Sequence, residues 1–182
     1  MTIEWVMGLL PIVFMLHDFE ELIMFEPWLR KNRAEIARRF PPIDRVLRAH
    51  HDRLSAAGFA VAVAHEFSLI AGITVVALAL GLYGLWFGAF AAFSLHLLVH
   101  IAQWVAYRKY VPCVITSVLA LPYCVVALDR FLATTTLSAG ALALWAALGV
   151  ALTGLSFPSA FWLATRFERW KVAGYLGHGP TH

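Results

Sequence analysis

Apolar residues dominate five stretches of this chain, and each stretch is long enough to cross a lipid bilayer as a helix. Because the hydrocarbon layer is about 30 Å thick, one crossing needs roughly 20 mostly apolar residues. The stretches cover residues 3–25, 55–80, 85–107, 111–128 and 138–163. The pattern predicts an all-α protein, a polytopic membrane helical bundle of five transmembrane helices that forms a single membrane domain over residues 1–182.

The segment 26–54 has a different pattern, in which arginines are mixed with apolar side chains such as Trp28. Pro41 and Pro42 interrupt the segment near its middle. This composition predicts a cytoplasmic amphipathic loop of two short helices on the inner membrane surface, although a solvated connector is an alternative. At the other end of the chain, residues 173–182 are predicted to be a flexible tail.

The lysines and arginines predict an orientation, because basic residues in short loops favour the cytoplasmic side of a membrane. With the N-terminus outside and the C-terminus cytoplasmic, all of the 14 basic residues except Arg130 lie on the inner side. This topology and contact with lipid headgroups account for the net charge of +3. The bilayer is therefore a predicted partner, and nucleic acid is not.

Three of the five spans carry polar residues that are costly to place in a bilayer. They are His17, Asp18, Glu20 and Glu21 in the first span, His65 and Glu66 in the second, and His96, His100 and Gln103 in the third. Such residues can be helix-to-helix hydrogen-bond partners. A structural role does not require so many of them, so a functional site is the preferred hypothesis.

Helical spacing and depth predict that these residues meet. At about 100° per residue, His17 shares a face of its helix with Glu20 and Glu21, and the third helix presents its polar residues within about 60°. At a rise of about 1.5 Å per residue from the cytoplasmic ends, the histidines lie about 11–17 Å deep and the two glutamates about 7 Å. One slab, between the bilayer centre and its inner face, therefore holds the imidazoles and carboxylates of three helices.

Imidazole nitrogen and carboxylate oxygen suit a divalent ion such as Zn or Fe. The predicted ligands are His17, Glu20, Glu21, His65, Glu66, His96 and His100. Seven ligands exceed the needs of one tetrahedral ion, so two bridged ions are predicted, as in di-iron helical bundles. The acid/base groups among them are Glu20, Glu21 and Glu66. Supporting roles around the ligands are assigned to Asp18, Gln103 and Arg108, and headgroup contact is the alternative for Arg108.

These features favour a metal-dependent integral membrane enzyme that acts on a lipophilic or amphiphilic small molecule through metal-activated water or oxygen. A proton-coupled or metal-ion transporter is one alternative, because His and Glu also form relays. The outer halves of the spans are nearly free of polar residues, which disfavours a path across the membrane. A haem-binding protein is another alternative, but three glutamates at the same depth fit haem poorly.

The stretch H-D-F-E-E at residues 17–21 resembles the defining motif of the HXXEE family of small bacterial and archaeal membrane proteins. The AHEF of the second span and the LxxxH and RKYVP of the third are similar to further blocks of that family. The family tends to show Arg-x-x-x-Pro-Gly in the last block, whereas this chain has Arg108, Pro112 and Cys113. The resemblance implies a shared fold and site in a prokaryotic inner membrane, and it implies no particular reaction.

Overall fold

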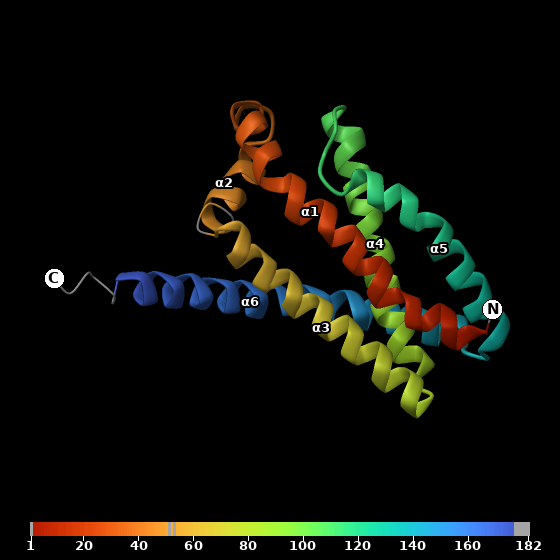
Figure 1. Cartoon of the computed structure of the whole chain (residues 1–182). Helices are drawn as coiled ribbons and strands as arrows, with labels where there is room; N and C mark the ends of the chain where they lie inside the picture. The colour runs from red at the N-terminus through yellow and green to blue at the C-terminus, as the bar shows by residue number, and fades with distance from the viewer. Residues whose placement is uncertain (1, 51, 53, 177–182) are drawn as a thin grey trace.

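The structure, a computed structural model, describes residues 2–50, 52 and 54–176 (Figure 1). Within these residues the regular structure consists of long helices, and no strand is present. The helices are α1 (Ile3–Arg39), α2 (Pro41–His50), α3 (Ala56–Leu80), α4 (Tyr83–Tyr107), α5 (Val114–Thr134) and α6 (Ala139–Leu176). The prediction of an all-α protein is confirmed.

The first helix is longer than predicted, because α1 continues through Pro27 to Arg39. The predicted end at residue 25 is therefore wrong, and the first of the two amphipathic helices expected in 26–54 is the end of α1. The second is α2, which begins with two prolines at a position where a missing N–H leaves no helix hydrogen bond unmade.

Contacts from the connection between α4 and α5 hold α1 together beyond its internal proline. The Nε1 of Trp28 donates a hydrogen bond of 2.7 Å to the carbonyl of Tyr110, and the Nζ of Lys109 lies 2.7 Å from Glu35. Lys109 and Arg39 lower the pKa of Glu35 from 4.5 to about 2 by hydrogen bonding to its carboxylate. These tertiary contacts offset the hydrogen bond that a proline removes from a helix.

The middle spans follow the predicted boundaries more closely. The N-cap of α3 is Ser55, whose hydroxyl accepts a hydrogen bond from the amide of Gly58, and α3 ends at Gly81 in the left-handed conformation. α4 begins two residues before the predicted start. α5 continues to Thr134, past the predicted end at residue 128, and the hydroxyl of Thr134 donates to the carbonyl one turn back.

The last helix also extends past its predicted end at residue 163, because α6 continues through Pro158 to Leu176. A proline inside a span can be tolerated where neighbouring helices support the backbone. The predicted tail 173–182 is helical as far as Leu176, and residues 177–182 lie outside the described residues.

Among the described residues, four helices are long and apolar enough to cross a membrane: α3, α4, α5 and α6. α1 is not one of them, because Glu4, Asp18 and Glu20 lie within its apolar stretch. Composition therefore supports four of the five expected spans. The span predicted at residues 3–25 and the orientation of the termini are left without support.

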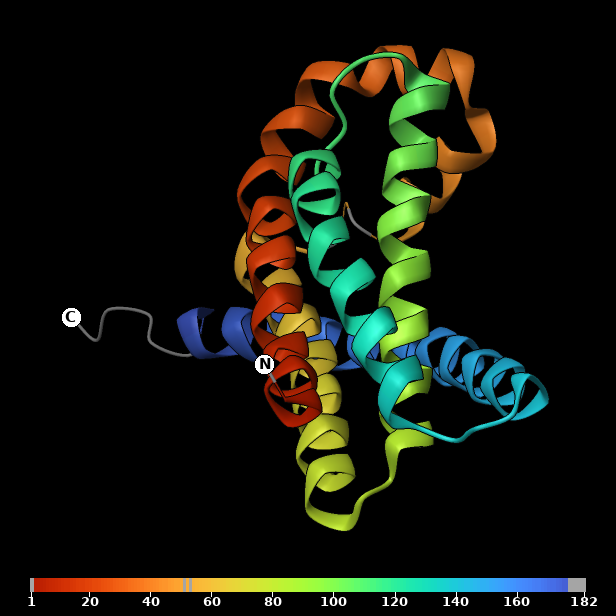
Figure 2. The ribbon, with the colours of Figure 1, turned by 90° about the vertical axis from the view of Figure 1, so that its right-hand side faces the viewer.

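The main core joins α1 to α4 and α5. The indole Nε1 of Trp86 donates a hydrogen bond of 3.2 Å to the carbonyl of Met7, and Phe131 stacks against the same indole with 5.6 Å between ring centroids. Figure 2 shows α1, α4 and α5 beside one another in this region. This packing fixes the position of α1, which carries the polar motif, against α4.

α6 runs across α3 and α4 instead of alongside them (Figures 1 and 2). The closest approach joins two glycines, because a Cβ on Gly149 would collide with the backbone of Gly88. Trp145, one turn earlier on α6, lies against Gly84 and Gly88. Because neither glycine has a side chain, the backbones of α4 and α6 can approach closely where the two helices cross.

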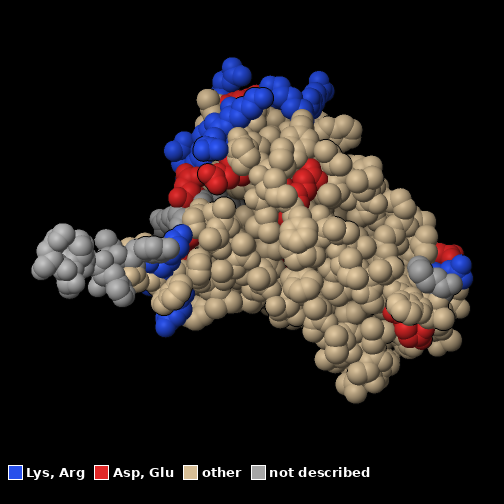
Figure 3. All heavy atoms as spheres, viewed as in Figure 1, with Lys and Arg blue, Asp and Glu red and all other residues tan. Residues whose placement is uncertain are grey.

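Most of the lysine and arginine is gathered at one end of the molecule, and a smaller group of charged residues lies at the opposite end (Figure 3). Figure 3 shows lysine and arginine over the end of α1, over α2 and around the end of α6, and a wide surface of other residues beside them. Many large apolar side chains of the helices are exposed, including Leu119 of α5 at 70% and Leu155 of α6 at 73%. Such a surface is compatible with a bilayer environment.

Candidate metal centre

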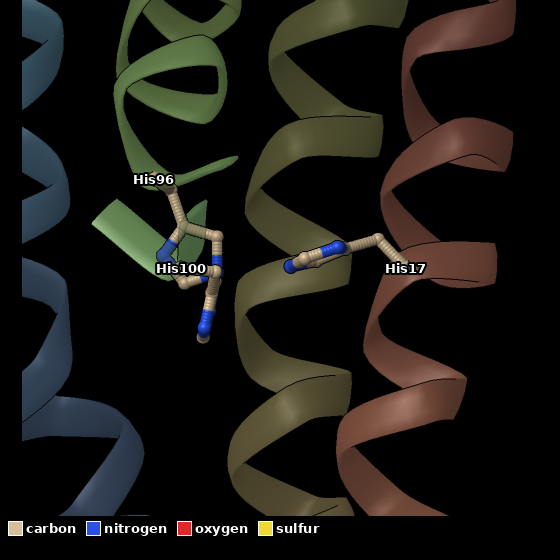
Figure 4. A group of neighbouring side chains, drawn as sticks. All are labelled: His17, His96 and His100. Atoms are coloured by element: carbon tan, nitrogen blue, oxygen red, sulfur yellow. The ribbon is translucent and has the colours of Figure 1, made fainter. Parts of the chain in front are cut away.

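Three imidazoles from two helices meet beside the core. His17 of α1 and His96 and His100 of α4 each offer a ring nitrogen within 4.8 Å of the other two, and we call these residues the histidine cluster. In Figure 4 the ring of His17 extends from α1 toward the pair on α4. His96 and His100 are one turn apart and therefore share a face of α4.

The spacing within the histidine cluster suits a shared ion. The Nε2 atoms of His96 and His100 are 3.1 Å apart. Two nitrogens on one tetrahedral zinc ion, with bonds of about 2.0–2.1 Å, are about 3.3 Å apart. Neither the Nε2 of His17 nor the Nδ1 of His100 has a hydrogen-bond partner, although both atoms are buried. Buried polar atoms normally have a partner, so the cluster offers two unpartnered ring nitrogens in a buried place.

The ring of His17 is oriented by a relay that begins at Glu20. The hydroxyl of Thr116 donates a hydrogen bond of 2.6 Å to the carboxylate of Glu20, and its oxygen lies 3.2 Å from the Nδ1 of His17. A hydroxyl has one proton, so the Nδ1 of His17 must be the donor in the second contact. The lone pair of His17 is then on Nε2, which is the nitrogen a metal would bind.

Glu20 also fixes the start of α5. One carboxylate oxygen accepts a hydrogen bond of 2.8 Å from the amide of Thr116, and the other accepts one of 2.7 Å from the hydroxyl of Tyr110. The amide of Thr116 is among the first of α5, which have no partner within their own helix. The carboxylate is thus fully engaged as a cap and as the support of His17.

A second group of possible ligands shares His100 with the histidine cluster. Glu21, His100 and Cys113 each offer a ligand atom within 4.8 Å of the other two. Cys113 is the residue that precedes α5, its side chain is fully buried, and its φ of 71° is left-handed. A thiol therefore lies beside the imidazoles and a carboxylate.

A cavity of about 850 Å³ lies against these residues. Its polar wall consists of Asp18, Glu21, Glu66, His96, His100, Gln103, Thr153 and Ser156, and its other lining is apolar. α6 forms one side of the cavity, and its Leu148, Leu152 and Phe157 are at the same time 41–55% exposed. A largely apolar cavity with a few convergent polar groups is typical of a small-molecule site.

Three carboxylates of the cavity lie near one another. Asp18 is close enough to Glu21 and Glu66 for their charges to interact. The ion pairs among the described residues join none of the three to a lysine or arginine. Buried charges of one sign need a compensating cation or protons, so this wall is suited to hold a metal ion.

Comparison with known proteins agrees with the motif. A family model described as a protein of unknown function with an HXXEE motif matches residues 8–127. The chain belongs to the HXXEE family. No curated protein and no solved structure matches it.

The structure gives the three named residues of the HXXEE motif different surroundings. His17 points into the histidine cluster, Glu21 faces His100 and Cys113, and Glu20 turns toward α5. Consecutive residues of a helix are about 100° apart, which separates the two glutamates onto different neighbours. Within the HXXEE motif, His17 and Glu21 are the residues placed to bind an ion.

The AHEF block joins α3 to α6. The Nε2 of His65 lies 3.2 Å from the hydroxyl of Ser159, and the carboxylate of Glu66 accepts a hydrogen bond of 2.7 Å from Ser156. Glu66 lines the cavity, whereas His65 belongs to neither group of possible ligands. The structure therefore brings five of the seven predicted ligands to the cavity or its histidine cluster and directs His65 and Glu20 elsewhere.

The three predicted supporting residues also differ from one another. Asp18 and Gln103 line the cavity, and Gln103 lies beside His100. Arg108 is exposed at the end of α4, in a left-handed turn with φ of 61°. It does not line the cavity.

Two residues at the site that lie outside regular helix, Tyr110 and Cys113, were not among the predicted ligands or supporting residues. Both lie in the connection before α5, where the chain leaves regular helix. Helical periodicity carries no information about such a segment. For Cys113 a signal was available, because a cysteine that follows Pro112 at the start of a span lies at the depth of the polar slab.

Proposed function

We propose that this chain is a metal-dependent integral membrane enzyme that acts on a lipophilic or amphiphilic small molecule. The observation that carries the proposal is the meeting of His17 with His96 and His100, two histidines that line a largely apolar cavity of about 850 Å³. Three imidazoles, two of which have a buried ring nitrogen without a hydrogen-bond partner, form a ligand set for zinc or iron. Such an ion would supply a Lewis acid and a means to activate water or oxygen.

The residues around the centre have complementary tasks in this proposal. Glu20 and Thr116 hold His17 in the tautomer that leaves Nε2 free. Glu21 and Glu66 line the cavity, where either carboxylate can accept a proton from a reacting group. A second ion is supported by the second group of ligands around His100, in keeping with the predicted dinuclear centre.

The shape of the cavity supports an apolar chain as part of the substrate. Its lining on α4 runs from His96 back to Leu85, and that on α6 from Ser156 back to Trp145. Each stretch is twelve residues, whose ends are about 16 Å apart along the helix. The hydrocarbon of one bilayer leaflet is about 15 Å deep, so one extended lipid chain fits an arm of this length.

We also propose that α1 crosses the membrane in addition to α3, α4, α5 and α6, which gives five spans. The N-terminus would then lie outside and the C-terminus in the cytoplasm of a prokaryotic cell. The first half of α1 packs between apolar helices, while Ile12, Leu16 and Ile23 are 55–67% exposed on its other side. An exposed apolar face on a packed helix is typical of lipid contact. The end of α1 joins the basic end of the molecule, which favours the inner side (Figure 3).

Metal analysis of protein purified in detergent tests the enzyme proposal. We expect the wild type to carry zinc or iron, and His100→Ala to lose it, because His100 is shared by both groups of ligands. His65→Ala is the matched control and should keep the metal, because His65 faces Ser159. An absorption spectrum of the same sample would expose haem. The proposal fails if the wild type holds no more metal than His100→Ala.

A further inference from the structure

Cys113 adopts a backbone conformation that residues with a side chain rarely take. Its φ of 71° is left-handed, a region that suits glycine because a Cβ crowds the following carbonyl oxygen. The turn begins α5, since the carbonyl of Cys113 accepts the amide of Ser117 at 2.9 Å. A glycine would form this turn more easily. The turn alone therefore does not explain why position 113 is a cysteine.

The thiol of Cys113 is buried beside possible metal ligands. Cys113 has no exposed surface, and its Sγ lies 4.0 Å from the carbonyl of His17. Its ligand atom is within 4.8 Å of those of Glu21 and His100. His100 is 8% exposed, and its Nδ1 has no hydrogen-bond partner. An unpartnered imidazole nitrogen, a carboxylate and a thiol thus share a buried place.

We propose that Cys113 binds the metal of this centre through its thiolate. The inference rests on the proposed metal centre and names a ligand of different chemistry. On binding, the metal–sulfur bond forms as the S–H bond breaks, the proton leaves to solvent, and no redox change occurs. Thiolate, imidazole and carboxylate together suit zinc and other borderline divalent ions.

The three ligand atoms would need to move only slightly closer together to bind one ion. Nitrogen and sulfur donors on one tetrahedral zinc, with bonds of about 2.0 and 2.3 Å, lie about 3.5 Å apart. The group of Glu21, His100 and Cys113 is within 4.8 Å, so its side chains need to approach by about 1 Å. Rotation of the carboxylate of Glu21 can supply part of that movement, since its chain is the most flexible of the three.

Cobalt(II) substitution tests the thiolate directly, because a cobalt–thiolate bond gives a near-ultraviolet charge-transfer band that nitrogen and oxygen ligands do not give. The purified full chain would be loaded with Co²⁺ as wild type, Cys113→Gly and Cys113→Ser. The glycine variant suits the left-handed turn, so its fold should be kept, as a thermal melt without metal would check. Cys124→Ala is the control, because Cys124 packs in the core cluster away from the ligands.

We expect the band in the wild type and in Cys124→Ala, and its loss in both Cys113 variants. Cobalt affinity of Cys113→Gly should fall at least about tenfold, since even the loss of a ligand's supporting partner weakens metal binding that much. A wild type that binds cobalt without the band, or a band that survives in Cys113→Gly, overturns the inference and leaves the centre intact. A wild type that binds no cobalt overturns the centre itself.

Discussion

Thr116 stands between a carboxylate and an imidazole, and its single hydroxyl proton can serve only one of them. The hydroxyl donates its proton to Glu20 in a hydrogen bond of 2.6 Å. Its oxygen can then accept a hydrogen bond from the Nδ1–H of His17. A metal ligand whose second nitrogen is held in this way is oriented and fixed in one tautomer. Glu20 thus acts on the proposed centre through two other residues.

Thr116→Val removes this hydroxyl and keeps the shape of the side chain. We expect metal affinity to fall about 10–100-fold, because His17 loses the contact that fixes its tautomer. The amide of residue 116 can still bond to Glu20, so the fold should be kept. Thr116→Ser, which retains the hydroxyl, is the control. Equal affinity in Thr116→Val and wild type, measured by titration with Zn²⁺, would contradict the relay.

Helical geometry identified part of this site from the sequence alone. Depth and the i, i+4 spacing placed His17 with His96 and His100, as the structure does. The same reasoning could not distinguish Glu20 from Glu21, because the choice depends on which helix packs on each side of α1. It also missed Cys113, since the position of that thiol depends on a left-handed turn outside regular helix.

At the scale of helices, the first and last helices extend beyond the spans predicted from hydropathy. α1 continues through Pro27 to Arg39, and α6 continues through Pro158 to Leu176. Sequence patterns describe the hydrogen bond that a proline removes. They do not describe contacts from distant segments that compensate for it, such as those of Lys109 with the end of α1.

The contact between Lys109 and Glu35 should appear in the pH dependence of stability. Because the pKa of Glu35 is lowered to about 2, its carboxylate stabilises the fold above the ordinary pKa of 4.5, and this contribution is lost as the pH falls toward 2. Thermal melts in detergent would measure it. Glu35→Gln should show a weaker loss of stability across that range, and identical slopes for both proteins would argue against the contact.

The crossing of α4 and α6 depends on the two glycines that meet there. Gly149→Ala should destabilise the protein by about 1–3 kcal/mol, because the added methyl group meets the backbone of Gly88 and must push the helices apart. Gly154→Ala, on the same helix, meets nothing within 4 Å and should not lower the melting temperature in detergent. Similar melting temperatures for the two variants would contradict this packing.

For the whole molecule, the sequence predicted the class of fold better than the number of crossings. Four helices are apolar enough to be counted by composition, and α1 is not. The difference has a physical cause, since the residues that make α1 a candidate for function, such as Asp18 and Glu20, also lower its hydropathy. A helix that carries several carboxylates is therefore harder to recognise as a span from its composition.

Labelling from the two sides of the membrane would determine the topology. Glu4→Cys and Arg38→Cys place thiols at exposed positions near opposite ends of α1, and the native cysteines are buried. If α1 crosses the membrane, a membrane-impermeant maleimide should reach position 4 from outside the cell and position 38 only from the cytoplasm. Labelling of both positions from one side would mean that α1 does not cross.

The exposed leucines that α6 contributes to the cavity have a consequence for how catalysis would be measured. Leu148 and Leu152 line the cavity and are 41–55% exposed, so in a bilayer this side of the cavity would border lipid if α6 crosses the membrane as proposed. A substrate dissolved in the bilayer would reach it by lateral diffusion. The concentration that governs the rate would then be the mole fraction of substrate among lipids, and inert detergent or lipid added at constant total substrate should slow turnover by surface dilution.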